Sequence, residues 1–279
     1  MADMVFQKSD VDIFSGNAES EKKISKKRSV FFIVVLTVIF LFLLVEVVYY
    51  LLVIPTTSKP NIQFRGNDKI SLVKLKLLSG LQGDESWRSI NTFELAQRFS
   101  TYPLIESVNV EKKFPDKVLV NIIERKPVAI GFTTIDGISI PLKIDKYGVI
   151  FEVGVCEFKA LPVISGLSFK NAKIGMQVNK SLLPLFMQLE KLQIEFGGLM
   201  NEISEIKIVE KKFGGYELLV YPVKTPVHVR TQDLLTGDVL KYIMLVVDVI
   251  NGTGVVSSIR EVDIRSGNAV YVKQGVNDE

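Results

Sequence analysis

Side chains that could act as nucleophiles, acid–base groups or metal ligands are few in this chain. It holds one histidine, His228, and one cysteine, Cys156. A nucleophile with a histidine base would have to use His228, and a single cysteine can form neither an internal disulfide nor a cysteine-rich zinc site. The sequence TPVHVR predicts a strand in which His228 is exposed. Cys156, in FEVGVCEF, alternates with apolar residues and is typical of a buried or half-buried small hydrophobe.

The remaining polar residues form no recognisable catalytic pattern. Asp145, Glu261 and Asp263 stand among basic residues, and solvation at the surface accounts for them. No GxSxG, HExxH, Walker A or GxGxxG pattern occurs. The doublets Lys112-Lys113 and Lys211-Lys212 mark turns and lack the interleaved aromatic residues of a nucleic-acid-binding stripe. We therefore expect no catalytic residues, no cofactor, no metal and no nucleic-acid partner. An anchored cell-wall enzyme that uses one acid or His228 stays open as an alternative.

The net charge of +3 comes from one short segment. Among the 279 residues, 34 are Lys or Arg and 31 are Asp or Glu, and five of the basic ones stand together without an acid: Lys22, Lys23, Lys26, Lys27 and Arg28. The rest of the chain is nearly neutral. Directly after this cluster, residues 30–54 are apolar except for Thr37 and Glu46. As a helix this run is about 37 Å long, enough to cross a hydrocarbon core of about 30 Å.

The apolar run predicts a retained single-pass anchor. A cleaved signal peptide begins similarly, but its apolar region is about half as long, and LLVIPTTS has no small-x-small cleavage site. The basic cluster predicts that residues 1–29 stay in the cytoplasm and that the C-terminal domains lie outside. The cluster can also bind anionic lipid, and we favour the topology signal. Glu46 either faces a partner helix or reaches toward the outer interface, where Tyr49 and Tyr50 are typical interfacial aromatics.

Residues 58–128 alternate strand and helix patterns. A brief extended run at 61–65 precedes helical patterns at 70–81 and from Asn91 or Thr92 to Phe99, and two alternating strands follow around a turn at FPDK. The order β-α-α-β-β predicts a compact α+β module.

Residues 129–274 are rich in strand patterns, and residues 275–279 form a short tail. Two helices interrupt the strands: Ser181 is a candidate cap for 182–196, with Gly197-Gly198 as the stop, and the second covers 234–250. We expect an antiparallel or mixed sheet with two covering helices. The predicted strands are 128–134, 139–144, 203–209, 216–223, 227–231, 259–265 and 269–273.

Several strings carry a family resemblance. In the first module they are Tyr102-Pro103-Leu104-Ile105, Phe114-Pro115-Asp116-Lys117-Val118 and Glu124-Arg125-Lys126-Pro127-Val128-Ala129; beyond it they are Leu142-Lys143-Ile144-Asp145 with Gly148 and Phe151, Leu161-Pro162-Val163-Ile164-Ser165-Gly166, and Val262-Asp263-Ile264-Arg265. In this order they resemble the POTRA domain and C-terminal β domain of the bacterial cell-division FtsQ/DivIB family. Ser107 stands where that family usually has alanine, and Phe114 where tryptophan is common.

The resemblance implies a non-enzymatic scaffold of the divisome in the bacterial cytoplasmic (inner) membrane, a single-pass type II protein at the septum. It implies FtsB/DivIC with FtsL as partners, further FtsK, FtsW and FtsI-type septal proteins, and contact with the lipid bilayer. A POTRA-type secretion or assembly factor is the other alternative; it would need repeated modules or a long C-terminal barrel.

The resemblance also implies where partners bind. The last hairpin leaves a candidate open sheet edge, which on physical grounds is either a strand-accepting surface or an ordinary edge guarded by Lys273. The implied FtsB/FtsL-binding residues are Val262, Asp263, Ile264, Arg265, Gly267, Ala269, Val270, Tyr271 and Val272, with Tyr271 as the anchor. The implied POTRA contact surface is Ile105, Glu106, Val108, Lys112, Lys113, Phe114 and Pro115.

Overall fold

The computed structural model describes residues 11–135, 137–154, 161–167 and 172–273, with the backbone alone over 11–27. Cys156 and the tail 275–279 lie outside the described residues, as do the side chains of Lys22, Lys23, Lys26 and Lys27. The chain divides into two compact units, and each is described by itself. The first comprises residues 1–63, 80–93 and 110–120, and the second comprises 64–79, 94–109 and 121–279.

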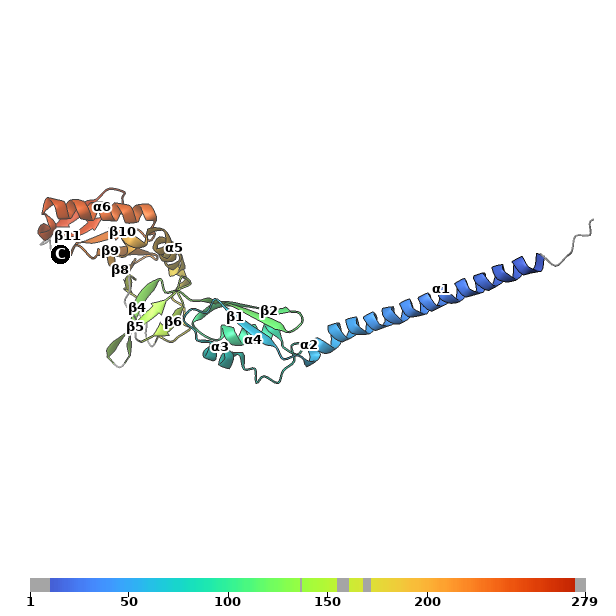
Figure 1. The fold of residues 1–279 in the computed structure, drawn as a ribbon. Helices are drawn as coiled ribbons and strands as arrows, with labels where there is room; N and C mark the ends of the chain where they lie inside the picture. Colours follow the sequence, from blue (N-terminus) through green and yellow to red (C-terminus); the bar gives the residue numbers. More distant parts are fainter. Residues whose placement is uncertain (1–10, 136, 155–160, 168–171, 274–279) are drawn as a thin grey trace, which may run out of the picture. The chain divides into compact units, whose positions relative to one another are not determined.

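The N-terminal part is one long helical segment. α1 (Val11–Val48) continues through a π-helical turn, η1 (Tyr49–Val53), into α2 (Ile54–Thr57) (Figure 1). The segment Arg28–Thr57 contains an 18-residue window with a mean hydropathy of 3.1, none of it buried, and the segment is long and apolar enough to cross a membrane. The predicted span 30–54 lies inside this segment, which provides a single-pass membrane anchor near the N-terminus.

The module after the anchor has the predicted β-α-α-β-β order. It consists of β1 (Asn61–Arg65), α3 (Leu72–Ser79), α4 (Thr92–Ser100), β2 (Ile105–Lys113) and β3 (Lys117–Glu124), and the sheet order is β1-β3-β2.

The first helix of the module is shorter than the predicted 70–81, for two local reasons. The Glu124 carboxylate accepts hydrogen bonds from two backbone N–H groups just ahead of α3. The N–H of Lys69 lies 3.0 and 2.9 Å from its two oxygens, and the N–H of Ile70 lies 2.9 Å from one of them. Gly80, with φ of +64°, follows its last residue. The side chain of Asn91 accepts the N–H of Phe93 at 3.1 Å and caps α4, as its position in the sequence indicates.

The C-terminal domain contains one mixed sheet of nine strands. Their order is β12-β11-β10-β9-β8-β7-β4-β5-β6, and the pairs β10–β11, β4–β7 and β7–β8 are parallel. The strands are β4 (Ala129–Ile135), β5 (Ile138–Ile144), β6 (Ile150–Val153), β7 (Val163–Ser165), β8 (Ile203–Glu210), β9 (Tyr216–Pro222), β10 (His228–Thr231), β11 (Ile259–Asp263) and β12 (Val270–Lys273). The predicted strands are present; β6 and β7 are additional, and their three or four residues are too short to show a period of two.

The two predicted helices are α5 (Leu183–Met200) and α6 (Gly237–Thr253). The expected cap at Ser181 is wrong: the Asn179 side chain accepts the N–H of Ser181 at 3.2 Å and begins a short 3₁₀ turn instead. The predicted end at Phe196, before Gly197-Gly198, coincides with a break in the helix: Phe196 has non-helical dihedrals (φ −134°, ψ 36°). Beyond this kink a short helical segment continues to Met200, whose side chain is fully buried. Thr236 caps α6, so this helix begins three residues later than expected.

Both helices pack on one face of the nine-stranded sheet. Leu185 and Leu189 of α5 and Ile243 and Val247 of α6 join a single core with inward-facing strand residues such as Val220. Figure 1 shows α6 lying along the part of the sheet formed by β9, β10 and β11. α6 connects β10 to β11, and the parallel pairing of these strands requires such a crossover. The sheet strands therefore present their other face away from α5 and α6.

A buried ion pair joins two of the family-like strings. Asp145 is 1% exposed and pairs with Arg125, and its other oxygen accepts the N–H groups of Tyr147 and Val149 at 3.0 and 2.8 Å. Arg125 also donates to the carbonyl of Pro103 at 3.0 Å. The expectation of a solvated surface acid at position 145 is wrong, because this carboxylate organises the turn between β5 and β6.

Candidate functional site

The sheet ends at β12, whose four residues Val270–Lys273 are all exposed. We call these residues the β12 edge. β12 pairs only with β11 in the sheet order, antiparallel, with Val262 opposite Tyr271 and Asp263 opposite Val270. The sequence expectation of a terminal hairpin with an outer strand agrees with this arrangement.

The opposite edge of the sheet, at β6, is covered. The N–H of Ile150 donates to the Met176 carbonyl at 2.8 Å, and the Ile150 carbonyl accepts the N–H of Gly175 at 2.7 Å. The N–H of Val178 donates to the Gly148 carbonyl at 2.9 Å. The segment 175–178 therefore occupies the backbone groups that a further strand would need at β6, so the two sheet edges differ in availability.

The direction of the backbone groups along β12 follows from one hydrogen bond. The N–H of Ile264 donates to the backbone carbonyl of Arg230 on β10 at 2.9 Å. The backbone groups of Ile264 therefore point toward β10, and so do those of Val262, two residues earlier. The intervening Asp263 then faces β12 and pairs with Val270. Tyr271, opposite Val262, forms a pair without hydrogen bonds, and its N–H and C=O point to the open side. Among the residues that the structure describes, these two groups have no backbone partner.

An apolar groove runs beside the β12 edge on the face that carries α6. Its volume is about 330 Å³, and Tyr271 lines it together with residues of α6 such as Leu245 and Val249. Tyr271 and Leu245 are each 59% exposed. The groove places apolar side chains next to the unpaired backbone groups, which is the combination that an added strand with apolar side chains would use.

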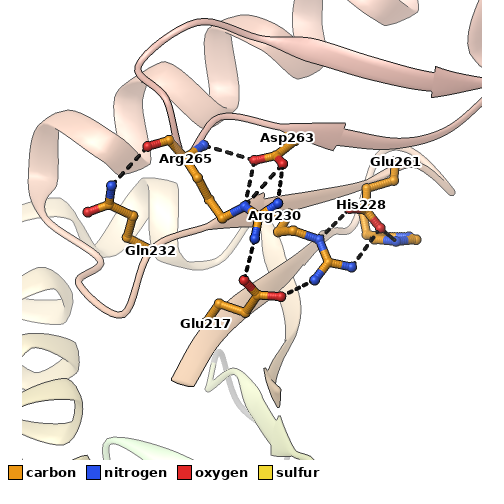
Figure 2. A network of polar contacts seen from close by, with 7 residues as sticks. All are labelled: Glu217, His228, Arg230, Gln232, Glu261, Asp263 and Arg265. Carbon is orange, nitrogen blue, oxygen red and sulfur yellow. Dashed lines mark hydrogen bonds and ion pairs between the residues drawn. The ribbon is translucent and has the colours of Figure 1, made fainter. Parts of the chain in front are cut away.

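The other face of the same strands carries a polar network (Figure 2). Arg230 of β10 pairs with Glu217 of β9 and with Glu261 of β11, and the imidazole of His228 lies 3.0 Å from the Glu261 carboxylate. Arg265 donates to Glu217 at 2.6 Å. The network thus links β9, β10, β11 and the turn that leads into β12.

Two carboxylates of this network have altered acidities. Hydrogen bonding from Arg230 holds the pKa of Glu261 below its ordinary value, and the nearby His228 acts in the same direction. Hydrogen bonding from Arg265 likewise lowers the pKa of Asp263. Both shifts favour the ionised forms of Glu261 and Asp263, which accept charge-assisted hydrogen bonds from Arg230 and Arg265.

The VDIR string alternates between the two faces of the sheet. The side chains of Val262 and Ile264 are 1% and 7% exposed and belong to the core, and Val262 also lines the floor of the groove; their part in partner binding stays a prediction. Asp263 and Arg265 belong to the network and pair with each other at 2.6 Å. These four residues therefore position the β12 edge.

The turn from β11 to β12 is fixed at its backbone. Gly267 has a φ of +87° and donates to the Ile264 carbonyl at 3.0 Å, and the Gln232 side chain donates to the Arg265 carbonyl at 2.8 Å. Of the predicted binding residues, Val270, Tyr271 and Val272 are the exposed ones in β12, and Ala269 lines the groove.

Sequence reasoning misread His228 and missed two of its neighbours. His228 is not exposed: its side chain retains 14% of its accessibility, and its ring stacks on Tyr221 with 5.1 Å between centroids. Glu261 and Asp263 are network members rather than solvated acids. Glu217 and Arg230 were not singled out; the alternation of charged and apolar residues in YEL, HVR and EVD was the available signal for a polar sheet face.

Only some of the residues in the implied POTRA contact surface are exposed. Ile105 is 2% exposed and belongs to the core, so its side chain does not lie at the surface, and its part in a partner contact stays a prediction. Glu106 and Val108 are half-buried, and Glu106 pairs with Lys146 at 3.2 Å. In the first unit Lys113 and Phe114 are exposed, whereas Lys112 and Pro115 are half-buried.

The described residues contain no group of three or more His, Cys, Asp or Glu side chains that could hold a metal ion. Two guanidinium groups neutralise the carboxylates beside His228, so this constellation is arranged to tie strands together. What the region offers chemically is the outward N–H and C=O of Tyr271 with an apolar groove beside them.

Comparison with known proteins identifies the first module. A search of curated proteins gave no match. The family model of the POTRA domain, FtsQ-type, matches residues 60–125, which contain β1 to β3 and both short helices. This domain supports a general scaffold role in cell division, which agrees with the membrane anchor and the strand-rich C-terminal region. The chain thus carries an FtsQ-type POTRA domain, which confirms its resemblance to the FtsQ/DivIB family.

Proposed function

We propose that this protein recruits FtsB/DivIC, together with FtsL, by strand addition to the β12 edge. The observation that carries the proposal is the outward direction of the Tyr271 N–H and C=O beside the apolar groove, while the β6 edge is covered. A partner strand would gain main-chain hydrogen bonds along β12 and place alternate side chains on the α6 face. The ring of Tyr271 would serve as the anchor of this contact.

The recruited pair links the protein to septal peptidoglycan synthesis. Residues 1–29 lie in the cytoplasm, and the POTRA and β domains lie outside the membrane at the division septum. The POTRA domain contributes contacts to FtsK, FtsW or FtsI-type proteins. Because the anchor confines the chain to the same membrane as its partners, the effective concentration is high and each contact can be weak.

Two substitutions at one residue separate backbone pairing from side-chain contact. Tyr271→Pro removes the outward N–H without removing a β11–β12 hydrogen bond, and Tyr271→Ala removes the ring but keeps the N–H. For strand addition we expect the proline variant to bind FtsB/DivIC more weakly than the alanine variant in a pull-down with the full chain. Equal binding by the wild type and the proline variant would exclude pairing at this edge.

A deletion of residues 269–279 tests the same edge more broadly. The residues of the buried core all precede Gly267, so the remaining domain keeps its core. We expect loss of FtsB/FtsL binding with a largely unchanged circular dichroism spectrum. In cells, a fluorescent fusion should form a mid-cell band, and depletion of the protein should prevent recruitment of FtsL; uniform membrane fluorescence would contradict the septal location.

A further inference from the structure

An aromatic cluster in the first unit joins the POTRA module to the membrane helix. Phe114, in the turn between β2 and β3, lies edge-on to Tyr50 with 5.1 Å between ring centroids and edge-on to Trp87 at 6.1 Å. The ammonium group of Lys112 lies 5.2 Å from the centroid of the Trp87 ring. We call Tyr50, Trp87, Lys112 and Phe114 the aromatic cluster.

Hydrogen bonds hold this cluster against the outer end of the helix. The N–H of Arg88 donates to the Pro55 carbonyl at 3.1 Å, and the N–H of Trp87 donates to the Ser58 carbonyl at 3.2 Å. The indole N–H of Trp87 donates to the Lys117 carbonyl at 2.8 Å, and Lys112 donates to the Arg88 carbonyl at 3.0 Å. The cluster therefore stays at the level of Tyr50 and the residues just after it.

The length of the helix sets that level relative to a bilayer. The apolar run begins at Val30, and a hydrocarbon core of about 30 Å takes about 20 helical residues at 1.5 Å each. The outer boundary of the hydrocarbon then falls at Tyr49 and Tyr50. Beyond it the headgroup layer is about 5–7 Å thick, so Phe114 and Trp87, which lie next to this boundary, fall within the headgroup layer. Aromatic rings with a polar group favour this layer.

Cations surround the cluster. The exposed residues Lys59, Arg88 and Lys113 make no ion pair among the residues that the structure describes. The turn 111–117 contains three lysines and two acids, Glu111 and Asp116. When Asp84 and Glu85 ahead of Trp87 are counted as well, these segments hold five basic and four acidic residues, so the local charge is slightly positive and suits an anionic surface.

We propose that the aromatic cluster and the cations beside it form a second membrane contact, in which the β2–β3 turn sits among anionic phospholipid headgroups. Phe114 and Trp87 occupy the boundary between hydrocarbon and headgroups, and Lys59, Arg88 and Lys113 bind phosphate oxygens. Apart from Tyr50, the residues of this contact lie outside the membrane-spanning helix, and none of them belongs to the β12 edge. It gives the turn a lipid partner, whereas the sequence implied a protein partner for the same residues.

Trp87 is the single tryptophan of the chain and reports directly on this contact. The full chain is reconstituted in vesicles that contain phosphatidylglycerol and phosphatidylcholine with bromine near the headgroup or deep in the acyl chain. We expect strong quenching of Trp87 emission by the shallow bromines, weak quenching by the deep ones, and protection from aqueous acrylamide. Absence of quenching at both depths would overturn the proposal, and so would equal quenching in vesicles without phosphatidylglycerol.

The chain offers a matched control because the string VEKKF occurs twice, at residues 110–114 and 209–213. Phe213, in the second string, is fully exposed. The double substitution Lys113→Glu with Arg88→Glu reverses two exposed charges. It should weaken binding of the turn to the headgroups by at least about fivefold, measured as reduced quenching of Trp87 emission by bromine near the headgroup. Lys212→Glu with Phe213→Ser should leave the quenching unchanged. Equal quenching in the wild type and the charge-reversed variant would overturn the assignment to anionic headgroups.

Discussion

Arg265 donates to Glu217 across 2.6 Å, although 48 residues separate them in the chain. Glu217 lies in the interior of β9, and Arg265 opens the turn before β12. This contact fixes the start of the exposed strand to a strand three positions away in the sheet. The position of the β12 edge thus depends on a carboxylate of β9, which is separated from β12 by two strands.

Replacing Glu217 by Gln should destabilise the β domain. The side chain is 9% exposed and faces both Arg230 and Arg265, so the amide would leave two guanidinium groups without their shared carboxylate. We expect a loss of about 2–4 kcal/mol in the free energy of unfolding, measured with urea. Glu195→Gln is the control, because Glu195 is 48% exposed and pairs loosely with Lys191; it should change stability by less than about 0.5 kcal/mol. Equal effects of both substitutions would contradict the importance of the network.

The network should make the β domain sensitive to acid. The folded pKa values of Glu261 and Asp263 lie below the unfolded values of about 4.3 and 3.9. Their stabilisation is therefore complete above about pH 5 and is lost as the pH falls through the lower folded values. The free energy of unfolding should be smaller at pH 3 than at pH 7, and Glu261→Gln should reduce this difference. An unchanged pH dependence in that variant would show that other groups cause it.

A charged side chain introduced into the groove beside β12 should weaken binding of the partner. Leu245 lines it, and Leu245→Arg should weaken FtsB/DivIC binding at least tenfold, or about 1.4 kcal/mol, because the partner would bury an unpaired cation. Ile194→Arg changes a 78% exposed residue of α5 and is the matched control. Titration calorimetry of both variants measures the effect. If the two bind alike, the groove does not contribute to the interface.

Gly166 should be indispensable at the end of β7, which it follows directly. Its φ is +81°, and a Cβ there would lie 2.0 Å from the carbonyl oxygen of Ile208 on β8. Gly175 has a φ of +90°, but a Cβ there would meet no atom within 4 Å. Gly166→Ala should therefore lower the free energy of unfolding by at least about 2 kcal/mol more than Gly175→Ala, measured by thermal or urea unfolding.

The sequence predicted elements with a clear period and missed features that depend on long-range pairing. The anchor, the β-α-α-β-β module and the outer hairpin follow from apolar runs and alternation. β7 was missed because its three residues gain their strand geometry from parallel partners on both sides, β4 and β8. The kink at Phe196 lies where the two glycines predict an end of α5, and the sequence missed only the helical segment that follows it and buries Met200.

The candidate site was predictable in position but not in detail. The order of segments placed the hairpin last, and this was sufficient to suggest an outer strand. The core positions of Val262 and Ile264, and the ties from Asp263 and Arg265 to other strands, required the register of β10 against β11. Coverage of the β6 edge by residues 175–178 could not be foreseen, because these contacts have no periodic signal.

The place of β12 in the chain also orders events during synthesis. Among the described residues, every member of the buried core precedes Gly267, and the chain is made from its N-terminus. The sequence of the core is therefore complete before β12 is added to the chain. A partner that needs β12 can thus bind only a chain that already carries all of these core residues.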